Sequence, residues 1–592
     1  MTYLLTKKDQ NGNVHTYDYD VLGRSIADSV TVAAGNPQHV DTAVLRIQTD
    51  YNTQGLADTV TSFSSATGGS AALVNQVQNV YNGFGQLIQQ YQSHSGTVIT
   101  SGATATLSVS YGYSTDVSHT GGRLISMTYP SGLVLSYNYG STGSLNDVIS
   151  RLDSMSEPSG NSTVTLESYK YLGLSTVVER DHPQDGYNLT YIKQAGEANG
   201  PAGDPYNGLD QFGRVVDQRW INTNGTANSD ADRYTYTYDR DGNILTKNNT
   251  VNSGFNETYT YDALNQLASY TRNGTSSNYQ SFSLDALGNM NSVTTGNSTV
   301  SETHNSQNEL TGMGNTTLTY DNNGNTLTDD QGRTLVYDAW NRLIAVNGTS
   351  GQMMVTYAYD GTGRRITEAV AGTNPTQLYY STQWQVVQED TSGTSGNATL
   401  TLHAQYVWSA GAGYPDAMVC RDMDFNSSGT LNPGTLFIER TYALQDAGWN
   451  VTSLVNLQSS LPGDVNFDGR VGADDYVTLN RYFGQHVAGG AQMGDVNDDG
   501  VVIGDDYVTL NGEYGQSGAT TSWKLAERFV YDAYGKFATY LVGSGGTLTV
   551  GSDYLAWNYN PKGGRWDYVT GMYSYRGRDY SVTLMRWVQA EP

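Results

Sequence analysis

The chain has 592 residues, of which 37% are hydrophobic and 15% charged, while Gly (67), Tyr (45) and many Asn, Ser and Thr residues fill the difference. The net charge of -26 argues against nucleic acid or an anionic membrane as a partner, because phosphate binding needs Lys and Arg. The abundant aromatic residues argue against disorder, and the sequence contains no apolar stretch of about 18 residues that would span a membrane. The one cysteine, Cys420, excludes an intrachain disulfide, and we interpret it as a small buried apolar residue.

From the N-terminus onward, one short unit recurs: a strand ending in Tyr-Asp, a turn with Gly or Asn, then Arg or Gln and an apolar strand. It reads YDYDVLGRSI at Tyr17–Ile26 and YNGFGQLI at Tyr81–Ile88, and it is densest between Tyr236 and Ile366. A late copy, YDAYGKF, lies at Tyr531–Phe537. Self-similarity of this kind indicates a repeat architecture.

The residue types of the unit predict a β-hairpin. Alternation such as Tyr-Thr-Tyr-Thr-Tyr-Asp at Tyr234–Asp239 places every second side chain on one face of a strand. The Asp caps the turn that follows, and Gly or Asn takes the position with positive φ. One hairpin cannot bury its face alone, so hairpins in series predict a continuous sheet that curls into a wide shell or tube. The Tyr-Asp and Gly-Arg pairs are interpreted as packing and turn chemistry.

These motifs resemble the YD-repeat (RHS) family, and further matching stretches resemble its planctomycete-type members. They are YLGLSTVVERDHP (Tyr171–Pro183), GLDQFGRVVDQRW (Gly208–Trp220), YVWSAG (Tyr406–Gly411), YALQDAGWNVTSLV (Tyr442–Val455) and the C-terminal GMYSYRGRDYSVTLMRWVQAEP (Gly571–Pro592). The resemblance implies a hollow shell of spiralling β-sheet, which in toxin systems encloses a C-terminal toxin. The family core usually ends in Asp-Pro-x-Gly, whose Asp belongs to a self-cleavage apparatus. This chain has Glu591-Pro592 there, so we expect neither self-cleavage nor a toxin within it, and Arg578 and Asp579 are candidate remnants of that apparatus.

Two loops farther along, DVNFDGRVGADD and DVNDDGVVIGDD, have the ligand spacing of EF-hand calcium loops. Oxygen donors stand at positions 1, 3, 5 and 12, position 7 offers its backbone carbonyl, and Gly at position 6 allows the sharp turn around the ion. Position 12 is Asp rather than the usual Glu. The predicted ligands of two Ca²⁺ ions are Asp464, Asn466, Asp468, Arg470 and Asp475 in the first loop, and Asp495, Asn497, Asp499, Val501 and Asp506 in the second.

Each loop is followed by the same short amphipathic helix, Asp475–Gly484 and Asp506–Gly515. The duplicated loop-helix unit resembles a type I dockerin over about Pro462–Gly515. In dockerins, loop positions 10 and 11 contribute to partner recognition. Here these are Ala473-Asp474 and Gly504-Asp505 instead of the Ser-Thr pair common in cellulosomal dockerins. The expected partner is therefore another cohesin-like domain or a neighbouring copy of this chain.

We predict a mainly β fold: a YD-repeat β-shell or tube of spiralling antiparallel hairpins with a small all-α, dockerin-like EF-hand-type insertion. The expected domains are a shell over 1–456, the calcium-binding insertion over 457–521, and an RHS core-associated segment over 522–592 that completes the shell. No catalytic motif stands out: the sequence lacks HExxH, GxSxG and a phosphate-binding Gly-Lys loop, and its eight His are scattered. We therefore expect no enzyme and no catalytic residue.

Three functions remain open. The first is an extracellular or cell-surface structural protein that polymerises with itself through open sheet edges into a tube or filament, with the calcium module as connector. The second is an RHS-type encapsulation shell for a toxin or other cargo encoded downstream. The third is an enzyme carrying a dockerin, which is ranked last because the host sequence is repeat. The sequence alone ranks the structural protein first.

Overall fold

The chain folds as one long antiparallel meander in which nearly every strand pairs with the strands before and after it. The computed structural model describes residues 3–590 apart from 36–39, 103, 116–120, 195–196, 198–203, 226–227, 275–277, 393–399, 412, 425–437, 462, 466–469, 485–493, 497–500, 544–545, 552 and 554. Over these residues the strands form sheets of 24, 15 and four strands. We call the 24-stranded sheet the first winding and the 15-stranded sheet the second winding. The predicted mainly β fold of antiparallel hairpins is confirmed.

The first winding runs from β1 to β24, and its described residues also include one short α-helix and two 3-10 turns. Its elements are β1 (Thr6–Lys8), β2 (Val14–Tyr19), β3 (Ser25–Thr31), β4 (Arg46–Tyr51), β5 (Ala57–Phe63), η1 (Ser70–Ala72), β6 (Leu73–Tyr81), β7 (Leu87–Ser93), β8 (Ser108–Tyr113), β9 (Leu124–Thr128), β10 (Val134–Asn138), α1 (Leu145–Val148), β11 (Ser154–Ser159), β12 (Ser162–Leu172), β13 (Thr176–His182), β14 (Tyr187–Thr190), β15 (Asp217–Asn222), β16 (Ser229–Tyr238), β17 (Ile244–Asn249), η3 (Ser253–Phe255), β18 (Glu257–Tyr261), β19 (Leu267–Arg272), β20 (Tyr279–Leu284), β21 (Met290–Thr295), β22 (Ser298–His304), β23 (Leu310–Met313) and β24 (Thr316–Thr317).

The second winding, the helix pair between its strands β36 and β37, and the C-terminal sheet follow. They comprise β25 (Thr319–Tyr320), β26 (Thr326–Thr328), β27 (Thr334–Tyr337), β28 (Leu343–Asn347), β29 (Met353–Tyr359), β30 (Arg365–Val370), β31 (Thr376–Tyr380), β32 (Val386–Ser392), β33 (Leu400–Trp408), β34 (Met418–Asp424), β35 (Ile438–Gln445), β36 (Val451–Ser459), α2 (Ala473–Tyr482), α3 (Gly504–Glu513), β37 (Thr521–Tyr531), β38 (Phe537–Val542), β39 (Leu548–Gly551), β40 (Arg565–Asp567), β41 (Met572–Tyr575), β42 (Arg578–Ser581) and β43 (Arg586–Trp587). Over the described part of the chain, no helix is long and apolar enough to cross a membrane.

The repeated Asp builds each turn as the sequence predicts. In the turn after β29, Asp360 Oδ1 accepts hydrogen bonds from the backbone N–H of Thr362 (2.9 Å) and Arg364 (3.1 Å), while Oδ2 accepts from Arg364 Nε (2.7 Å). Gly363 between them has φ 94°. The side chain thus satisfies backbone donors that the sheet ladder leaves open. We call such turns Asp turns, including those that begin with Asn or Ser, and the sheet edge that carries most of them the Asp-turn edge; the turns at Asp9–Asn13 and Asp329–Arg333 lie on the other edge.

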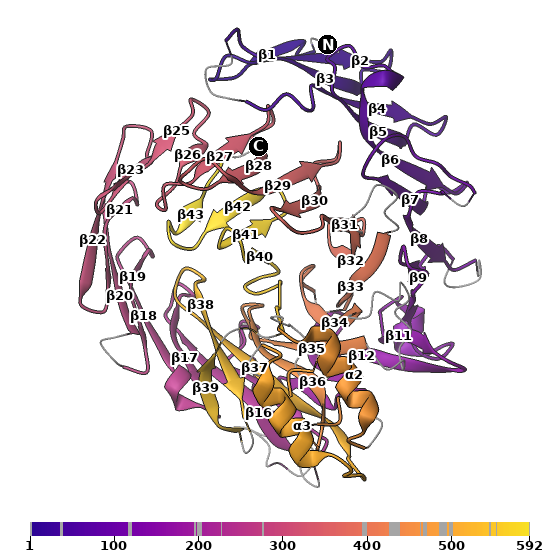
Figure 1. Ribbon diagram of the computed structural model, residues 1–592, viewed down its shortest axis with the longest axis vertical. Coiled ribbons are helices and arrows are strands. Elements are labelled where there is room, and N and C mark those ends of the chain that lie inside the picture. The colour runs from indigo at the N-terminus through magenta and orange to yellow at the C-terminus, as the bar shows by residue number, and fades with distance from the viewer. Residues whose placement is uncertain are drawn as a thin grey trace.

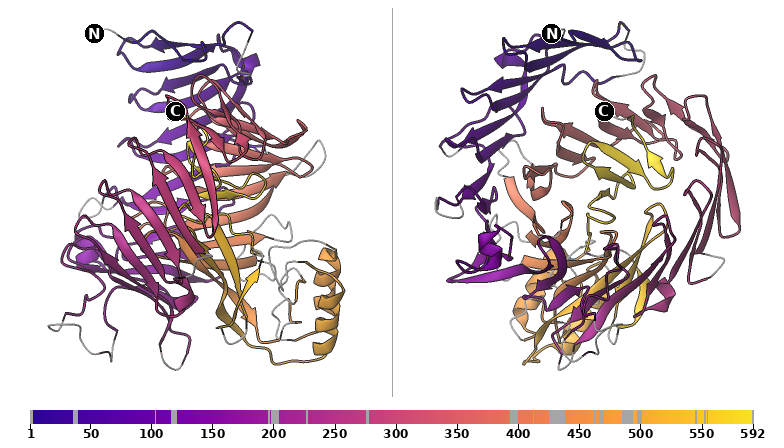
Figure 2. Two further views of the ribbon diagram at one scale, coloured as in Figure 1. Left: turned by 90° about the vertical axis from the view of Figure 1, so that its left-hand side faces the viewer. Right: turned by 180° about the vertical axis from the view of Figure 1, so that it is seen from behind.

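The two windings stack with a fixed polarity (Figures 1 and 2). Asp turns of the second winding pack on the opposite edge of the first winding. Trp340 Nε1 in one Asp turn donates to Asp28 on β3 (2.9 Å), and Gly361 in the next approaches Val60 on β5. The contact partners are about 300 residues apart along the chain. The Asp-turn edge of the first winding therefore remains on the outside of this contact.

Backbone carbonyls near the ends of second-winding strands accept hydrogen bonds from first-winding side chains. The strand register shifts just before most Asp turns, for example between Ala358 and Tyr359, and such a bulge leaves backbone groups outside the ladder. The pairs are Asn75 Nδ2 with Tyr359 O (2.8 Å), Gln92 Nε2 with Tyr380 O (2.7 Å), Tyr129 Oη with Tyr406 O (2.8 Å), Trp220 Nε1 with Gln445 O (2.8 Å) and Tyr270 Oη with Tyr531 O (3.1 Å). We call this zone the seam. It satisfies buried acceptors that would otherwise destabilise the fold.

The largest hydrophobic core lies between the windings. It combines Val109, Leu135 and Trp220 of the first winding with Tyr442 and Leu444 of the second. Cys420 belongs to the same cluster and is fully buried, in line with its interpretation as an apolar residue. Because neither winding covers this face alone, the two must fold against each other.

Candidate functional site

The predicted calcium module leaves the sheet between two paired strands. β36 and β37 pair, with one register shift between Leu454 and Val455, as far as Ser459 opposite Thr521, and Ser460 N–H donates to Thr520 O (2.9 Å) just beyond. Helices α2 and α3 stand away from the strands at one side of the molecule (Figure 2, left). The module therefore interrupts one hairpin of the second winding, on the edge opposite its Asp turns, and leaves strand pairing intact.

The two halves of the module fold against each other with reciprocal contacts. Val465, Val471 and Leu479 of the first half pack with their counterparts in the second half, Val496, Val502 and Leu510. A Cβ on Gly494 would lie 2.6 Å from the Leu479 backbone, and one on Gly463 would lie 3.4 Å from Leu510 Cα. Gly484 N–H donates to Val502 O (2.7 Å), and Gly515 N–H donates to Val471 O (2.8 Å). Each half thus completes the core of the other.

The structure places part of the predicted ligand set. Asp464 and Asp475, at positions 1 and 12 of the first loop, are fully buried, as are Asp495 and Asp506 in the second. Positions 3 and 5 of both loops, Asn466, Asp468, Asn497 and Asp499, lie outside the described residues. Arg470 and Val501, the predicted carbonyl donors, are described. Within the described part, no group of three or more His, Cys, Asp or Glu side chains forms a metal site.

The carboxylate at position 12 closes its own loop. Asp475 Oδ1 accepts from Val465 N–H (2.9 Å) and Oδ2 from Gly472 N–H (2.7 Å). Asp506 repeats the pattern with Val496 N–H (2.7 Å) and Ile503 N–H (2.8 Å). The same carboxylate sits at the N-terminus of the following helix, where the helix dipole favours negative charge. Burying two carboxylates at the ends of each loop suits a cation between them, so the described residues fit Ca²⁺.

A second candidate site is a cavity of about 680 Å³ inside the windings. Its wall combines first-winding residues such as Tyr259, second-winding residues such as Trp384 and Trp408, and C-terminal residues such as Tyr575 and Trp587. The cations at this wall are largely neutralised by acidic partners. Lys247 lies 2.6 Å from Asp446, Arg365 2.6 Å from Asp579, and Arg576 2.7 Å from Asp416. The cavity surface is therefore aromatic with paired charges.

The C-terminal sheet β40–β43 lies within the ring formed by the windings (Figure 1, yellow). Arg365 Nη2 on β30 pairs with Asp579 Oδ1 on β42 (2.6 Å), and both side chains are about 4% exposed. Asp579 also accepts from Gln589 Nε2 (3.1 Å). Tyr337 Oη donates to Val588 O (3.0 Å). These contacts anchor the C-terminal segment to the inner side of the second winding.

The candidate cleavage residues have structural partners. Asp579 is held by Arg365 and Gln589, and the Arg578 guanidinium lies 4.3 Å from the ring centre of Trp587. Glu591 and Pro592 lie outside the described residues. In this geometry, Asp579 anchors the C-terminal sheet to the second winding.

A buried charged cluster beside the seam was not found from the sequence. His182 on β13 is fully buried between Glu167 (3.5 Å) and Asp185 (3.7 Å), and Arg180 Nε lies 2.5 Å from Glu167. Burial alone lowers the pKa of His182, but Asp185 and Glu167 outweigh it and raise the pKa to about 9. Burial raises the pKa of Glu167, but Arg180 and His182 prevail and lower it to about 2. Ser409 also donates to Glu167 from the second winding, so no local spacing could have signalled the cluster.

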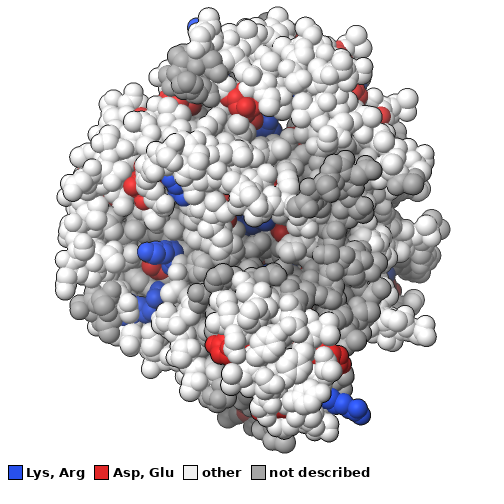
Figure 3. Space-filling view, viewed as in Figure 1, with Lys and Arg blue, Asp and Glu red and all other residues white. Residues whose placement is uncertain are grey.

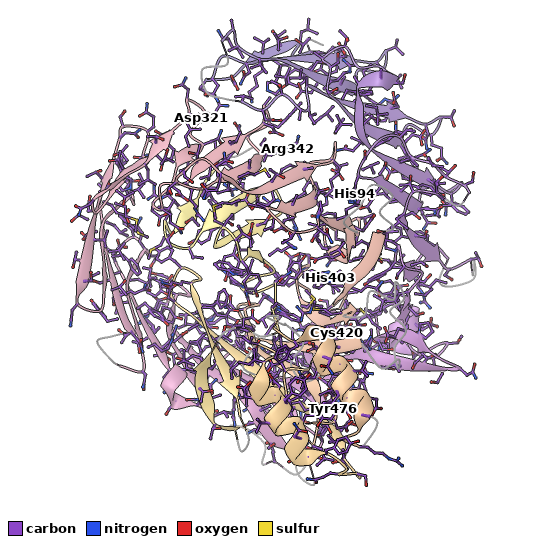
Figure 4. All side chains as sticks on the ribbon, in the orientation of Figure 1. His94, Asp321, Arg342, His403, Cys420 and Tyr476 are labelled. Carbon is purple, nitrogen blue, oxygen red and sulfur yellow. The ribbon has the colours of Figure 1, made fainter. Side chains whose placement is uncertain are left out.

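Few charged side chains appear on the face drawn in Figure 3, in keeping with the low charged fraction of the sequence. Figure 4 shows Tyr476 on the helix pair, while His94 lies higher up, between the two windings. His94 Nε2 contacts Leu378 O (3.0 Å) across the seam, so it is a structural residue of this contact.

The chain folds as a shell of antiparallel β-hairpins with its C-terminal sheet inside the ring of the windings. The family model described as Teneurin YD-shell matches residues 213–389. Among solved structures, the Photorhabdus luminescens Tc holotoxin pore with a mutated TccC3 is similar at 15% identity and a TM-score of 0.61, covering 99% of this chain and 25% of that one. TcdB2-TccC3 is similar at 14% identity and 0.61, covering 99% and 26%, and without its hypervariable C-terminal region at 0.59. This chain thus spans about a quarter of the length of those chains. No curated protein matches it by sequence.

Proposed function

We propose that this chain is an encapsulation shell whose interior receives a polypeptide cargo. This ranks the second of the three hypotheses above the structural filament that the sequence alone placed first. The observation that carries the proposal is the position of β40–β43, anchored inside the windings through Arg365 and Asp579. A cargo encoded downstream would continue from the segment that is already inside. The structural similarity to the Tc toxin structures supports the same ranking of the two hypotheses.

The cavity chemistry supports a polypeptide cargo. An aromatic wall whose charged residues are paired can contact many kinds of side chain without favouring a cargo of one charge. No catalytic role is assigned to the wall, and we keep the prediction that the chain is not an enzyme.

A reporter peptide fused after Pro592 tests this function. In the intact protein, we expect an added protease to cleave this reporter much more slowly than the same reporter fused before Met1. In Asp579→Ala, Arg365 loses its buried partner and the C-terminal sheet loosens, so cleavage should accelerate. Arg576→Ala, which breaks a half-exposed pair with Asp416, is the matched control and should retain protection. Equal cleavage of the two reporters in the intact protein would refute an enclosed cargo.

We further propose that residues 464–506 bind two Ca²⁺ ions and act as a calcium-dependent connector. The duplicated buried carboxylates and the reciprocal core support this. The connector would join the shell to a cohesin-like domain or a second copy, at an extracellular or cell-surface location where Ca²⁺ is plentiful. Calorimetric titration of the whole protein with Ca²⁺ should give two sites per chain.

A further inference from the structure

A largely buried lysine joins the two windings beside the internal cavity. Lys247 on β17 reaches Asp446, the first residue of the Asp turn after β35, and its Nζ lies 2.6 Å from Asp446 Oδ2. The two side chains are 14% and 2% exposed, and the residues stand 199 positions apart along the chain. Taking a pair of charges this far out of water is costly.

Other buried ion pairs of the fold share an arginine as their cation: Arg365–Asp579, Arg440–Asp422 and Arg528–Asp232. A guanidinium stays protonated and cannot act as a nucleophile, whereas a lysine amine can lose its proton and attack a carboxyl carbon. Lys247 therefore brings a chemistry to the contact between the windings that the arginine pairs lack.

The Asp turn presents the carboxyl group of Asp446 to this amine. In the turn Asp360–Arg364, Oδ2 of the Asp accepts from the arginine at the fifth position, but here that position is Asn450 and Oδ2 also faces Lys247. Oδ1 accepts from the backbone N–H of Gly448 (2.9 Å) and of Asn450 (3.0 Å). Two backbone donors on one oxygen stabilise the negative charge that develops there when a nucleophile adds to the carboxyl carbon.

Glu257 is the third member of the cluster. It is the cross-strand neighbour of Lys247 on β18, it is 4% exposed, and its Oε2 lies 3.7 Å from Lys247 Nζ. Tyr259 Oη donates to Oε2 (2.7 Å) and Tyr270 Oη to Oε1 (3.0 Å), which fixes the carboxylate beside the amine. A carboxylate at this place can carry a proton from the amine to the departing oxygen.

Two further tyrosines hold the reacting groups in place. Tyr236 stands opposite Lys247 on β16, and its Oη accepts from Ala447 N–H in the turn (3.3 Å). The ring centre of Tyr234 lies 4.8 Å from Lys247 Nζ. The amine and the carboxyl group are thus held against each other by both windings, which is the condition for a fast intramolecular reaction.

Before any reaction the pair is ionic. Burial lowers the pKa of Lys247, but Asp446 and Glu257 outweigh it and raise the pKa. Burial raises the pKa of Asp446, but Lys247 and Asn450 outweigh it and lower the pKa. One proton passed from Nζ to Oδ2 gives a neutral amine beside a neutral acid. This neutral pair is the minor form, so the reaction is slow compared with folding.

We infer that Lys247 and Asp446 condense to an amide that ties the first winding covalently to the second. Lys247 Nζ forms a bond to Asp446 Cγ, the bond from Cγ to Oδ2 breaks, and Oδ2 leaves as water with two protons from the amine. The first proton passes within the pair and the second passes through Glu257. Atoms and charges balance without a further reactant, and the cavity that Lys247 and Glu257 line receives the water.

The amide would close a loop of 199 residues, which restricts the unfolded chain and keeps the windings joined when their hydrogen bonds break. The reaction occurs once in each chain and does not depend on a cargo or on Ca²⁺. Its failure therefore leaves the proposed functions standing.

Mass spectrometry of the full chain tests the inference. After refolding and incubation at neutral pH, the protein should weigh one water, about 18 Da, less than its sequence mass. A tryptic digest should lack cleavage after Lys247 and contain a branched peptide that joins residues 241–272 to 441–470. Fragmentation should locate the branch at Lys247 and Asp446.

Lys247→Arg keeps the positive charge but cannot form the amide, so its mass should equal the sequence mass. Glu257→Gln should slow the loss of water about a hundredfold after refolding. Lys170→Arg is the matched control, because Lys170 pairs with Glu179 but is 58% exposed, and it should lose water like the unaltered protein. Circular dichroism checks that each variant is folded.

Three results would count against the amide. An unaltered protein that keeps its full sequence mass would overturn the inference. A loss of water that persists in Lys247→Arg would overturn it as well, because the dehydration would then lie elsewhere in the chain. A Glu257→Gln protein that reacts at the unaltered rate would overturn the role of Glu257 as proton carrier.

Discussion

The side-chain amide of Gln92 pairs with both backbone groups of Tyr380, 288 residues farther along the chain. Gln92 Nε2 donates to Tyr380 O (2.7 Å), and Tyr380 N–H donates to Gln92 Oε1 (3.0 Å). The amide thus takes the place of a neighbouring strand at a residue where the ladder shifts register. The pair fastens the first winding to the second at a buried point of the seam.

Replacing this amide should destabilise the shell. Gln92→Met keeps the length of the side chain but leaves the N–H and C=O of Tyr380 without this partner, at a cost of about 2–4 kcal/mol. Gln89→Met is the matched control on the same strand, because Gln89 Nε2 donates to Ser108 Oγ on the neighbouring strand (2.9 Å). The thermal unfolding midpoint should fall clearly for Gln92→Met and change little for Gln89→Met. Equal midpoints would contradict a structural role for this pair.

Two glycines at one turn position should respond differently to a methyl group. At Gly361, a Cβ would meet Val60 Cγ1 at 2.8 Å and Ile47 at 3.4 Å, so Gly361→Ala must push the windings apart. At Gly83, in the first winding, nothing lies within 4 Å. We expect Gly361→Ala to lower the free energy of unfolding by about 1–3 kcal/mol and Gly83→Ala to change it little. Denaturant titration of both variants checks this.

Calcium removal should unfold the helix pair and leave the sheets in place. Without the ion, the carboxylates of each loop repel one another, and the small core around Leu479 and Leu510 cannot hold the module alone. In chelator, limited proteolysis should cut within 460–520 and spare the rest of the chain, and added Ca²⁺ should restore resistance. Asp475→Ala should lose Ca²⁺ uptake at one of the two sites. Calorimetry without any heat of Ca²⁺ binding would remove the metal assignment.

His182 should make stability fall at alkaline pH. Its pKa is raised from 6.5 to about 9 in the folded protein, so the imidazolium contributes fully below pH 6.5 and the contribution disappears as the pH rises through 9. The full shift corresponds to on the order of 3 kcal/mol. His182→Gln should lower the thermal midpoint at pH 6 and flatten its decline between pH 6.5 and 9.

His94 should act in the opposite direction. Burial lowers its pKa from 6.5 to about 4, so its contribution is present above pH 6.5 and is lost as the pH falls towards 4. His94→Gln should therefore flatten the acidic side of the same stability profile. A profile with neither slope changed in the two variants would show that these groups do not govern it.

Much of the local structure could be predicted from the sequence. The Asp turns follow from five consecutive residues, as in Asp360–Arg364, and the turn that the repeat predicts is the one observed. The two short helices between β36 and β37 could also be predicted, since each follows from one short stretch of sequence. The cluster of Glu167 and His182 could not be predicted, because its partners come from separate strands and from both windings.

The sequence by itself determined the repeat, its turns and the two short helices α2 and α3, because these depend on contacts within a few residues. Only the tertiary structure decided which turns are covered. Trp340 and Leu264 occupy the same position of the same turn, yet one packs on His15 and the other faces solvent. That difference depends on whether another winding lies alongside, and a winding is brought there only by the curvature summed over many strands.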